Sequence, residues 1–385
     1  MSRVAWCGTV ALAVGCVNLS GLAVDIPPVP GCGDTSGLQP RSPMPMYGQC
    51  PSLRYRLPLP APTGTPQPRW AMPYGASPDR AVLIAAGGTL VVETTKPSVL
   101  ALSASDGTQR WEALLPGAPT GTSAIGADGN VYVAAGDELI GLRLSDGSAS
   151  TPAPATLPGT GTNVTLAPAG LILVTDDTMS LDAILPGGAL AWTRPLGGSP
   201  DHATPAIGAD GNIVLSADDG VVYRVTLDGS LVSTTPVQAG IDGDQIAVAL
   251  DGTLRIWSKG AMHTLDASGR VTCSAPTAPM ESFDLAVADD GTTIVGTSDA
   301  RLHAFDAGCN EVWSIGGGSF GTPTIASDGT ILVGSIEGRS LDALSPQGTL
   351  RWSVPLDYGL AAPPCIGADG SVYFVDTGGW VRAYD

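Results

Sequence analysis

The 385-residue chain is poor in basic residues. It has 18 lysines and arginines against 36 aspartates and glutamates, which gives a formal net charge of −18. Nucleic-acid backbones are bound by lysine and arginine side chains that displace counterions, so this composition argues against nucleic acid as a partner. Many of the acids fall in turns, where aspartate accepts hydrogen bonds from the local backbone, and this gives much of the charge a structural explanation.

The chain also lacks the usual signatures of metal and catalytic sites. Its three histidines, His202, His263 and His303, show no metal-ligand spacing. No D-x-D-x-D-G run followed by a liganding glutamate occurs, so the recurring Asp-Gly pairs indicate hairpin turns and not calcium loops. His263 and His303 occupy equivalent places in neighbouring repeats, which favours a structural role, and only His202 is placed for binding. The sequence predicts no catalytic residue, no metal site and no cofactor.

Long apolar runs are missing as well. The apolar stretch from Val4 to Val14 is too short to span a bilayer and, following Arg3, indicates an export signal. Ala13-Val14-Gly15-Cys16 resembles a bacterial lipobox, so we expect residues 1–16 to be a signal peptide with a lipid attached at Cys16. This predicts a protein of the bacterial cell envelope, as an outer-membrane lipoprotein on the periplasmic or surface face. Cleavage after Ala23 and simple secretion is the alternative.

Residues 17–65 are dense in proline, glycine and serine. Such a composition predicts a semi-extended tether with no regular structure and no core. Cys32 and Cys50 lie in this segment, and in an oxidising compartment we expect them to form a disulfide. Three further cysteines, at positions 273, 309 and 365, lie in the remainder of the chain; because their number is odd, at least one should be a buried thiol, and their pairing stays open.

Glycine is abundant, with 51 residues, and one glycine-containing turn recurs at nearly constant steps of 41, 41, 41, 41, 39, 38 and 41 residues. β-forming residues follow each copy and no helical pattern lies between copies. A period near 40 of this kind predicts a β-propeller in which each repeat is one four-stranded antiparallel blade. We therefore expect residues 66–385 to form one all-β domain, a monomeric eight-bladed β-propeller. The repeat glycines are Gly88, Gly129, Gly170, Gly211, Gly252, Gly291, Gly329 and Gly370.

Each blade should present two different rims. In the repeat of Gly211, Asp-Gly pairs form tight hairpins between the first and second strands and between the third and fourth strands. These connections lie on one side of a propeller, here called the turn rim, while the second connection and the inter-blade connection lie on the other, the loop rim. The loop rim is more variable, so we expect it to bind a partner. Its acidic residues would attract cations or a basic protein surface; they are Asp137, Glu138, Asp176, Asp177, Asp218, Asp219, Asp299, Glu337 and Asp376.

Tryptophan recurs with the repeat. Trp111, Trp192, Trp313 and Trp352 lie 22 or 23 residues after their repeat glycines, and Trp70 stands 18 residues before the first one. The last repeat ends at Asp385 without an outer strand. We therefore expect the segment from Pro66 to Tyr74 to supply that strand and close the ring, which removes both sheet edges.

The stretch from Ala101 to Trp111, ALSASDGTQRW, resembles the tryptophan-docking motif of quinoprotein dehydrogenase propellers, roughly A-x-D-x-x-T-G-x-x-x-W. The segments that end at Trp313 and Trp352 are similar. The resemblance implies that the five tryptophans pack between adjacent blades. Val232 and Val271 stand near the expected tryptophan in the fourth and fifth repeats, and the second repeat has no aromatic residue there. WD40 repeats would carry a Trp-Asp pair, which is missing, and kelch repeats are longer.

Two functions follow from this resemblance, and a third from the residues. Quinoprotein dehydrogenases hold pyrroloquinoline quinone (PQQ) with Ca²⁺ and commonly carry a vicinal disulfide and long insertions, whereas this chain has no Cys-Cys pair and almost no insertions. A PQQ-dependent enzyme is therefore the alternative. The expected function is that of the non-catalytic envelope lipoproteins of the BamB type, a scaffold that binds another protein or a surface polymer. A glycan-binding module, with Trp257 and Trp380 as stacking platforms, is the third possibility.

Overall fold

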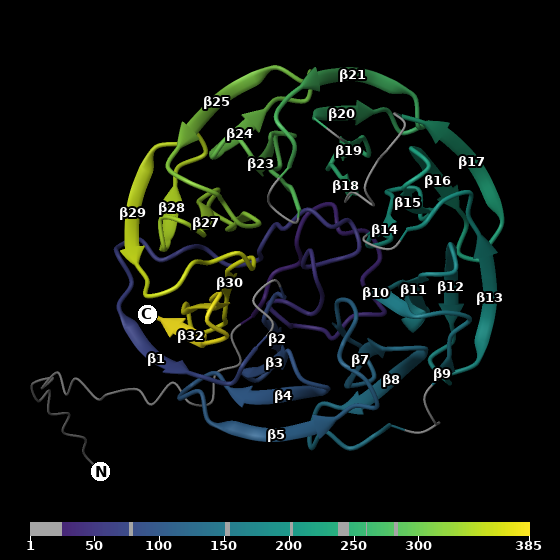
Figure 1. The fold of residues 1–385 in the computed structure, drawn as a ribbon, viewed down its shortest axis with the longest axis horizontal. Helices are drawn as coiled ribbons and strands as arrows, with labels where there is room; N and C mark the ends of the chain where they lie inside the picture. Colours follow the sequence, from purple (N-terminus) through teal and green to yellow (C-terminus); the bar gives the residue numbers. More distant parts are fainter. Residues whose placement is uncertain are drawn as a thin grey trace, which may run out of the picture.

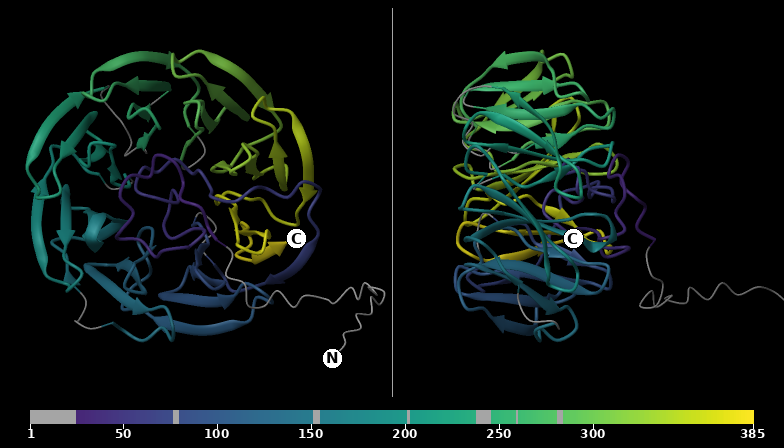
Figure 2. Two further views of the ribbon diagram at one scale, coloured as in Figure 1. Left: turned by 180° about the vertical axis from the view of Figure 1, so that it is seen from behind. Right: turned by 90° about the vertical axis from the view of Figure 1, so that its right-hand side faces the viewer.

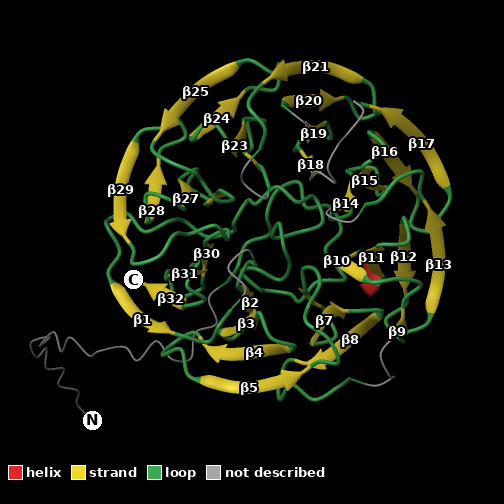
Figure 3. Cartoon of the chain, viewed as in Figure 1, coloured by secondary structure: helices red, strands yellow, loops and turns green. Residues whose placement is uncertain are grey.

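The computed structural model describes residues 25–76, 80–150, 155–200, 203–237, 246–258, 260–280 and 284–385. Eight four-stranded antiparallel sheets stand around a central axis and form a disc (Figure 1). Apart from a short 3₁₀ helix, η1 (Pro168–Gly170), the regular elements of the described residues are strands (Figure 3). The predicted eight-bladed propeller is confirmed.

Blades 1 to 7 each use four consecutive strands, and the first strand of each set lies nearest the axis. Blades 1 to 4 consist of β2 (Leu83–Ala85), β3 (Thr89–Glu93), β4 (Ser98–Ser103), β5 (Gln109–Leu114); β6 (Ala124–Ile125), β7 (Asn130–Ala135), β8 (Glu138–Arg143), β9 (Ala155–Thr156); β10 (Gly161–Leu166), β11 (Ile172–Asp176), β12 (Ser180–Ile184), β13 (Leu190–Pro195); β14 (Ala206–Ile207), β15 (Ile213–Ala217), β16 (Val221–Val225) and β17 (Leu231–Pro236). Blades 5 to 7 consist of β18 (Ile246–Val248), β19 (Leu254–Ser258), β20 (Ala261–Leu265), β21 (Val271–Pro276); β22 (Ala286–Val287), β23 (Thr293–Thr297), β24 (Arg301–Phe305), β25 (Glu311–Gly316); β26 (Thr324–Ile325), β27 (Ile331–Ser335), β28 (Ser340–Leu344) and β29 (Leu350–Pro355).

Blade 8 joins the two ends of the propeller. Its inner strands are β30 (Cys365–Ile366), β31 (Val372–Val375) and β32 (Val381–Tyr384), and its outer strand is β1 (Pro68–Met72). Trp70 pairs with Ala383, and Gln67 and Asp385 exchange backbone hydrogen bonds of 2.7 and 2.9 Å. The predicted closure by a strand from the front of the chain is confirmed.

A recurring contact joins most of the outer strands to the next blade. Between blades 6 and 7, the indole Nε1 of Trp313 donates to the carbonyl of Pro346 at 2.9 Å. The ring lies against Gly348, so close that a Cβ there would be 2.7 Å from it, and the φ of 76° at this glycine also disfavours other residues. We call this contact the dock. The same indole-to-carbonyl bond, at 2.9–3.0 Å, joins Trp70 to Ala104, Trp111 to Leu144, Trp192 to Leu227 and Trp352 to Pro62.

The dock between blades 5 and 6 contains a disulfide. Cys273 faces Thr264 in the register in which Trp313 faces Ala304, so Cys273 and not Val271 occupies the tryptophan position. Its partner is Cys309, the counterpart of Gly348 in the next hairpin, and Cys309 keeps a positive φ of 61°. A covalent bond thus replaces the indole contact.

The dock between blades 4 and 5 contains a guanidinium group. Ser233, and not Val232, occupies the tryptophan position, opposite Arg224. The Arg224 side chain donates to the carbonyl of Ala267, the counterpart of Pro346, and forms an ion pair of 3.1 Å with Asp210. A different donor therefore reaches the same kind of acceptor.

Residues 25–65 do not form the exposed tether that the composition predicts. Figure 2 shows this segment, in purple, inside the ring and toward one face of the disc. Met44 and Met46 are fully buried, and Tyr55 and Leu57 are each 1% exposed. Cys32 and Cys50 form a disulfide within the segment. We call residues 25–65 the plug.

The plug supplies hydrogen-bond acceptors to the inner strands. An innermost strand has an edge without a neighbouring strand, and its buried N–H groups need partners. Plug carbonyls accept from these N–H groups at 2.7–3.0 Å. The pairs are Met44 with Ile84, Pro45 with Ile125, Pro51 with Ile207, Ser52 with Val248, Arg54 with Val287 and Tyr55 with Ile325. A proline-rich segment, which has free carbonyls and no sheet of its own, suits this position, and this is why its composition was a poor guide to its burial.

The plug enters from the turn rim. Asp289, in the hairpin between β22 and β23, forms ion pairs of 2.5 Å with Arg54 and 3.0 Å with Arg56. The carbonyl of Gly37 accepts from Ala127 in the hairpin after β6. Both hairpins belong to the turn rim, so the plug lies on that side of the disc, away from the loop rim.

Replacing Leu57 by alanine should lower the free energy of unfolding by about 3 kcal/mol, because it leaves a cavity between the plug and blades 7 and 8. Urea denaturation of the full chain measures this. Leu350→Ala is the control, since Leu350 is 56% exposed. Equal losses in the two variants would contradict a packed plug.

Replacing Cys273 and Cys309 together by serine should cost about 2–4 kcal/mol, because the ring loses the disulfide that joins blades 5 and 6. Cys273→Trp with Cys309→Gly should recover most of that loss, since it rebuilds the indole dock, and its melting temperature should not respond to dithiothreitol. If this variant is no more stable than the serine variant, the two positions are not equivalent to those of the other docks.

Candidate functional site

The loop rim contains the predicted acidic residues in the connections between the second and third strands. The structure distributes them around the ring, one connection to a blade. Their environments fall into three groups, which differ in burial and in hydrogen bonding.

Asp176 and Asp376 are fully buried and organise their turns. Asp176 accepts from the backbone and hydroxyl groups of Thr178 and Ser180 at 2.9–3.1 Å. Asp376 forms an ion pair with Arg382 and accepts from the backbone of Trp380. Neither carboxylate faces solvent, so the two do not serve the partner-binding role predicted for them.

Four exposed carboxylates hold loops in place. Asp177 accepts from the backbone N–H of Thr160 at 2.8 Å, and Asp218 accepts from that of Ser199 at 2.7 Å. Both bonds tie an inter-blade connection to the neighbouring loop. Asp219 accepts from the hydroxyl of Tyr223. Asp299 accepts from the hydroxyl of Thr297 and from the ring of His303. These groups contribute negative charge to the rim but are already engaged.

Three acids of the rim have no such engagement. Within the described residues, the carboxylates of Asp137, Glu138 and Glu337 have no hydrogen-bond or ion-pair partner, and Asp137 and Glu337 are exposed. They are the acids best placed to meet a basic surface.

Aromatic and charged side chains gather on the loop rim where blades 7 and 8 meet. Tyr358 is 43% exposed, and its ring lies over Gly378, where a Cβ would be 2.8 Å from it. The half-buried ring of Trp380 lies 5.6 Å from the guanidinium of Arg382, which also reaches Asp357 at 3.4 Å. We call these five residues the blade 7–8 corner. Exposed aromatic side chains beside charged ones are typical of binding surfaces.

The other predicted platform, Trp257, is 1% exposed and packs against Phe305, so it is not available for stacking on a ligand. Cys16 and His202 lie outside the described residues. His263 and His303 are buried in the third strands β20 and β24, where burial lowers the pKa of His263. Cys365 is a buried free thiol, and burial raises its pKa to about 12.

Inside the ring, two plug tyrosines meet a buried carboxylate. The rings of Tyr47 and Tyr55 make an edge contact at 5.4 Å, and the hydroxyl of Tyr55 donates to Asp284 at 2.7 Å. Burial, followed by the charge of Asp284, raises the pKa of Tyr55 well above its usual range. In the described part of the chain no three histidine, cysteine, aspartate or glutamate side chains converge to hold a metal ion. No helix there is long and apolar enough to cross a membrane.

Blade 3 contains a pair of buried acids that the sequence did not reveal. Asp182 in β12 is fully buried; its Oδ1 accepts from Thr193 at 2.6 Å, and its Oδ2 has no hydrogen-bond partner. Burial, and next the nearby carboxylate of Asp176, raise the pKa of Asp182 to about 6. In blade 8 the corresponding pair is Asp376 and Arg382, which form an ion pair. In blade 3 the position of Arg382 is taken by Asp182, whose negative charge is repelled by Asp176.

The Asp182 pair should make stability depend on pH. The folded state holds the Asp182 proton more tightly than the unfolded chain, so protonation of Asp182 stabilises the fold. This stabilisation is complete below the unfolded pKa of about 4 and is lost as the pH rises through about 6. Asp182→Asn removes it, and we expect the variant to melt about 2–5 °C above the wild type at pH 7.5 but not at pH 4.5. Asp342→Asn, at the same strand position but with Ser335 in place of Asp176, is the control. A constant difference across the pH range would contradict the assignment.

Comparisons with known proteins agree with this fold. The family model described as outer membrane protein assembly factor BamB matches residues 61–240. A search of curated protein sequences gave no match. The crystal structure of BamB from Moraxella catarrhalis superimposes with a TM-score of 0.62 at 18% identity, over 84% of this chain and 98% of that chain.

Quinoprotein enzymes have the same fold. The quinohemoprotein alcohol dehydrogenase of Comamonas testosteroni gives a TM-score of 0.72 at 12% identity, over 91% of this chain and 81% of that one. ADHIIG from Pseudomonas putida HK5 gives 0.69 at 13%, over 93% and 83%. The repeat, the tryptophan docks and these superpositions agree on the fold, that of a PQQ-like β-propeller, and the BamB family model matches just under half of the chain.

Proposed function

We propose that this protein is a non-catalytic binding scaffold that docks a protein partner through its loop rim. The observation that carries the proposal is the asymmetry of the disc. The plug covers the channel from the turn rim, while unpaired carboxylates, the exposed ring of Tyr358 and the half-buried ring of Trp380 stand on the loop rim. The loop rim therefore offers a binding surface that the plug leaves uncovered.

The similarity to BamB supports this role. That protein is named for the assembly of outer membrane proteins, and nearly all of its structure has a counterpart in this chain. The dehydrogenase chains, by contrast, extend further beyond the shared fold. A scaffold needs only the propeller and its loops, which agrees with repeats that have few insertions.

We place the protein in the bacterial cell envelope, held by a lipid on Cys16. The lipobox-like Ala13-Val14-Gly15-Cys16 supports this, as does the disulfide between blades 5 and 6, since disulfides persist in oxidising compartments. The plug disulfide supports the same location.

A PQQ-dependent dehydrogenase is the second candidate, because the dehydrogenases superimpose with TM-scores of 0.69 and 0.72. The residues of the channel do not fit that cofactor and its calcium ion. The buried carboxylate Asp284 is already bound by Tyr55, and the described residues do not offer three converging acidic or imidazole ligands. The plug residues Met44 and Met46 are fully buried beside the inner strands of blades 1 and 2.

Charge reversal on the loop rim tests the scaffold function. Asp137→Lys with Glu337→Lys should reduce recovery of the partner from solubilised envelopes at least fivefold, because both carboxylates are free to pair with a basic surface. Quantitative mass spectrometry after affinity capture measures the recovery. Asp290→Lys with Glu112→Lys, which changes the charge equally on the turn rim and the outer wall, should leave it unchanged.

Trp380→Ala separates protein docking from glycan binding. Loss of the captured protein with no effect on a glycan array supports the docking role of the blade 7–8 corner, whereas loss of a sugar signal alone assigns the platform to a surface polymer. Equal capture by the two charge-reversed variants would contradict a role for the loop rim.

A further inference from the structure

The interface between blades 6 and 7 lacks a side chain that most of the other interfaces have. Where an outer strand ends, the next residue commonly donates its backbone N–H to the residue before the third strand of the same blade, as Leu356 does to Arg339. In five blades this residue is apolar and packs in a cluster that spans its own blade and the next one. These residues are Leu115, Leu157, Leu196, Val237 and Leu356.

In blade 6 this place belongs to a glycine. Gly316, the last residue of β25, pairs with Arg301, the first residue of β24. Gly317 therefore stands in the register of Leu356, which follows the same pairing in blade 7. The ring of Phe320 reaches toward the place, since a Cβ on Gly317 would lie 3.7 Å from it. No side chain of β25 or of the residue after it takes the place of the leucine.

A cavity of about 520 Å³ remains between β25 and blade 7, and we call it the blade 6–7 groove. Ile315, Gly317, Asp342 and Leu350 are among the residues that line it. Ile315 is half-buried and Leu350 is 56% exposed, so the groove opens on the outer wall of the disc. Its walls offer apolar surface to a group that enters from outside.

Asp342 brings a negative charge into this groove. Its neighbour in β28, Ala343, lies on the side of Trp352 and blade 8, so Asp342 faces blade 6. Its Oδ1 accepts from the hydroxyl of Ser353, and its Oδ2 accepts from the hydroxyl of Ser340 at 3.1 Å. Both partners are neutral. No lysine, arginine or histidine is among the described residues that line the groove, so no cation balances the carboxylate there.

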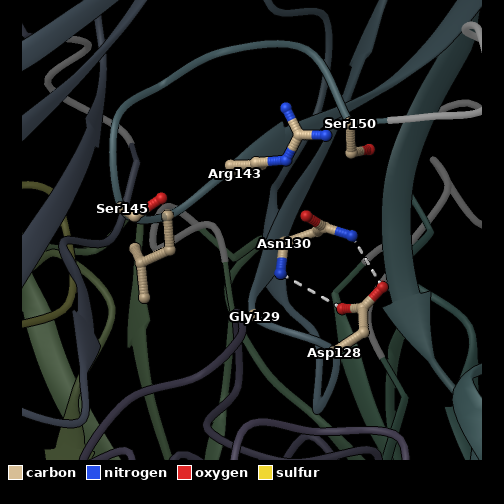
Figure 4. Close-up of a pocket in the computed structure, with 7 residues that line it drawn as sticks. Asp128, Gly129, Asn130, Arg143, Ser145 and Ser150 are labelled. Atoms are coloured by element: carbon tan, nitrogen blue, oxygen red, sulfur yellow. Dashed lines mark hydrogen bonds between the residues drawn. The ribbon is translucent and has the colours of Figure 1, made fainter.

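A cavity of about 500 Å³ in blade 2 provides the contrast. There Asp128 accepts from the backbone N–H of Asn130 at 3.1 Å and from its side-chain amide at 2.8 Å (Figure 4). The hydroxyl of Tyr132 donates a third bond at 2.6 Å, and the guanidinium of Arg143 lines the same cavity. That carboxylate is engaged within its own hairpin and shares its cavity with a cation, whereas Asp342 has only two hydroxyl partners.

We propose that the blade 6–7 groove binds a lysine side chain of the protein partner, an inference that rests on the proposed scaffold function. The apolar stem of the lysine lies against Ile315 and Leu350, and its ammonium group pairs with Asp342. Hydroxyl groups already bond both oxygens of this carboxylate, which favours a compact charge over the two-pronged guanidinium of arginine. The free carboxylate of Glu337 is close by, since a Cβ on Gly318 would lie 3.5 Å from the Glu337 Cβ, so one basic surface can meet both acids.

Methyl NMR of the full chain tests the groove without a partner. N-acetyl-lysinamide should shift the methyl signals of Ile315 and Leu350 saturably. N-acetyl-norleucinamide, which has the apolar stem without the charge, and N-acetyl-argininamide should each bind at least fivefold more weakly. Asp342→Asn should weaken binding of the lysine probe at least fivefold and leave that of the norleucine probe unchanged, because only the ion pair is lost. Asp290→Asn, which removes a carboxylate from the turn rim of blade 6, is the matched control and should bind every probe as the wild type does.

The absence of a saturable shift at these methyl groups, or equal binding of the lysine and norleucine probes, would overturn the proposal. Affinity capture separates it from the scaffold function, because Asp342→Asn should lower recovery of the partner at least threefold. If Asp342→Asn captures the partner as the wild type does while Asp137→Lys with Glu337→Lys loses it, the groove is rejected and the scaffold function stands. A wild type that binds the lysine probe but captures no protein rejects the scaffold function and leaves the groove as a lysine site.

Discussion

The dock, in which a side chain near the outer edge of one blade contacts the chain that leads into the outer strand of the next, is the contact on which the ring depends. The eight sheets share no strand with one another, so the ladder hydrogen bonds of a sheet hold each blade together, and isolated backbone bonds, such as that from Gly161 to Gly136, cross to a neighbour. Side chains supply most of the contact between blades, and the carbonyl at the hairpin is a fixed acceptor that several donors can reach. Indole, guanidinium and disulfide are three chemical solutions to a single geometric demand.

The centre of the ring poses a second demand. Each inner strand has one edge that no other strand pairs with. In an open channel the polar groups of these edges would either lack partners or bind water. The plug meets this demand with carbonyl groups of residues that have no sheet of their own. Its arginines, Arg54 and Arg56, pair with Asp289 on the turn rim, so the segment is held by charge as well as by backbone contacts. The propeller is thus closed around its circumference by β1 and along its axis by the plug.

The repeating features were open to prediction from the sequence because they are local. Each repeat glycine marks a hairpin that needs a positive φ. Trp70 precedes Gly88 by 18 residues, as Trp111 precedes Gly129, and this spacing revealed the closing strand. The plug was misjudged because burial there depends on a channel that exists only after the blades assemble. Composition alone does not show that inner-strand N–H groups lie beside the plug carbonyls and need acceptors.

The same reason explains the errors at the site. Asp176 and Asp177 are adjacent in sequence, yet one is buried and the other exposed, since successive residues at a strand end face opposite ways. Trp257 lies near a loop in sequence and packs inside, against Phe305 of the next blade. The equivalence of Cys273 with tryptophan required the strand register, which a count from the repeat glycine did not give. By contrast, Trp380 and the free carboxylates of Asp137 and Glu337 lie on the surface where the repeat pattern put them.

A segment that passes into the disc through one side gives the molecule a front and a back. The plug lies on the turn-rim side of the disc, and the loop rim remains clear of it. Mechanical load applied at Asp25 would reach the Cys32–Cys50 disulfide and the hydrogen bonds of Gly37 and Gln39 to the start of blade 2 before it reached the outer strands. The axis of the wheel, and not its circumference, would carry the strain.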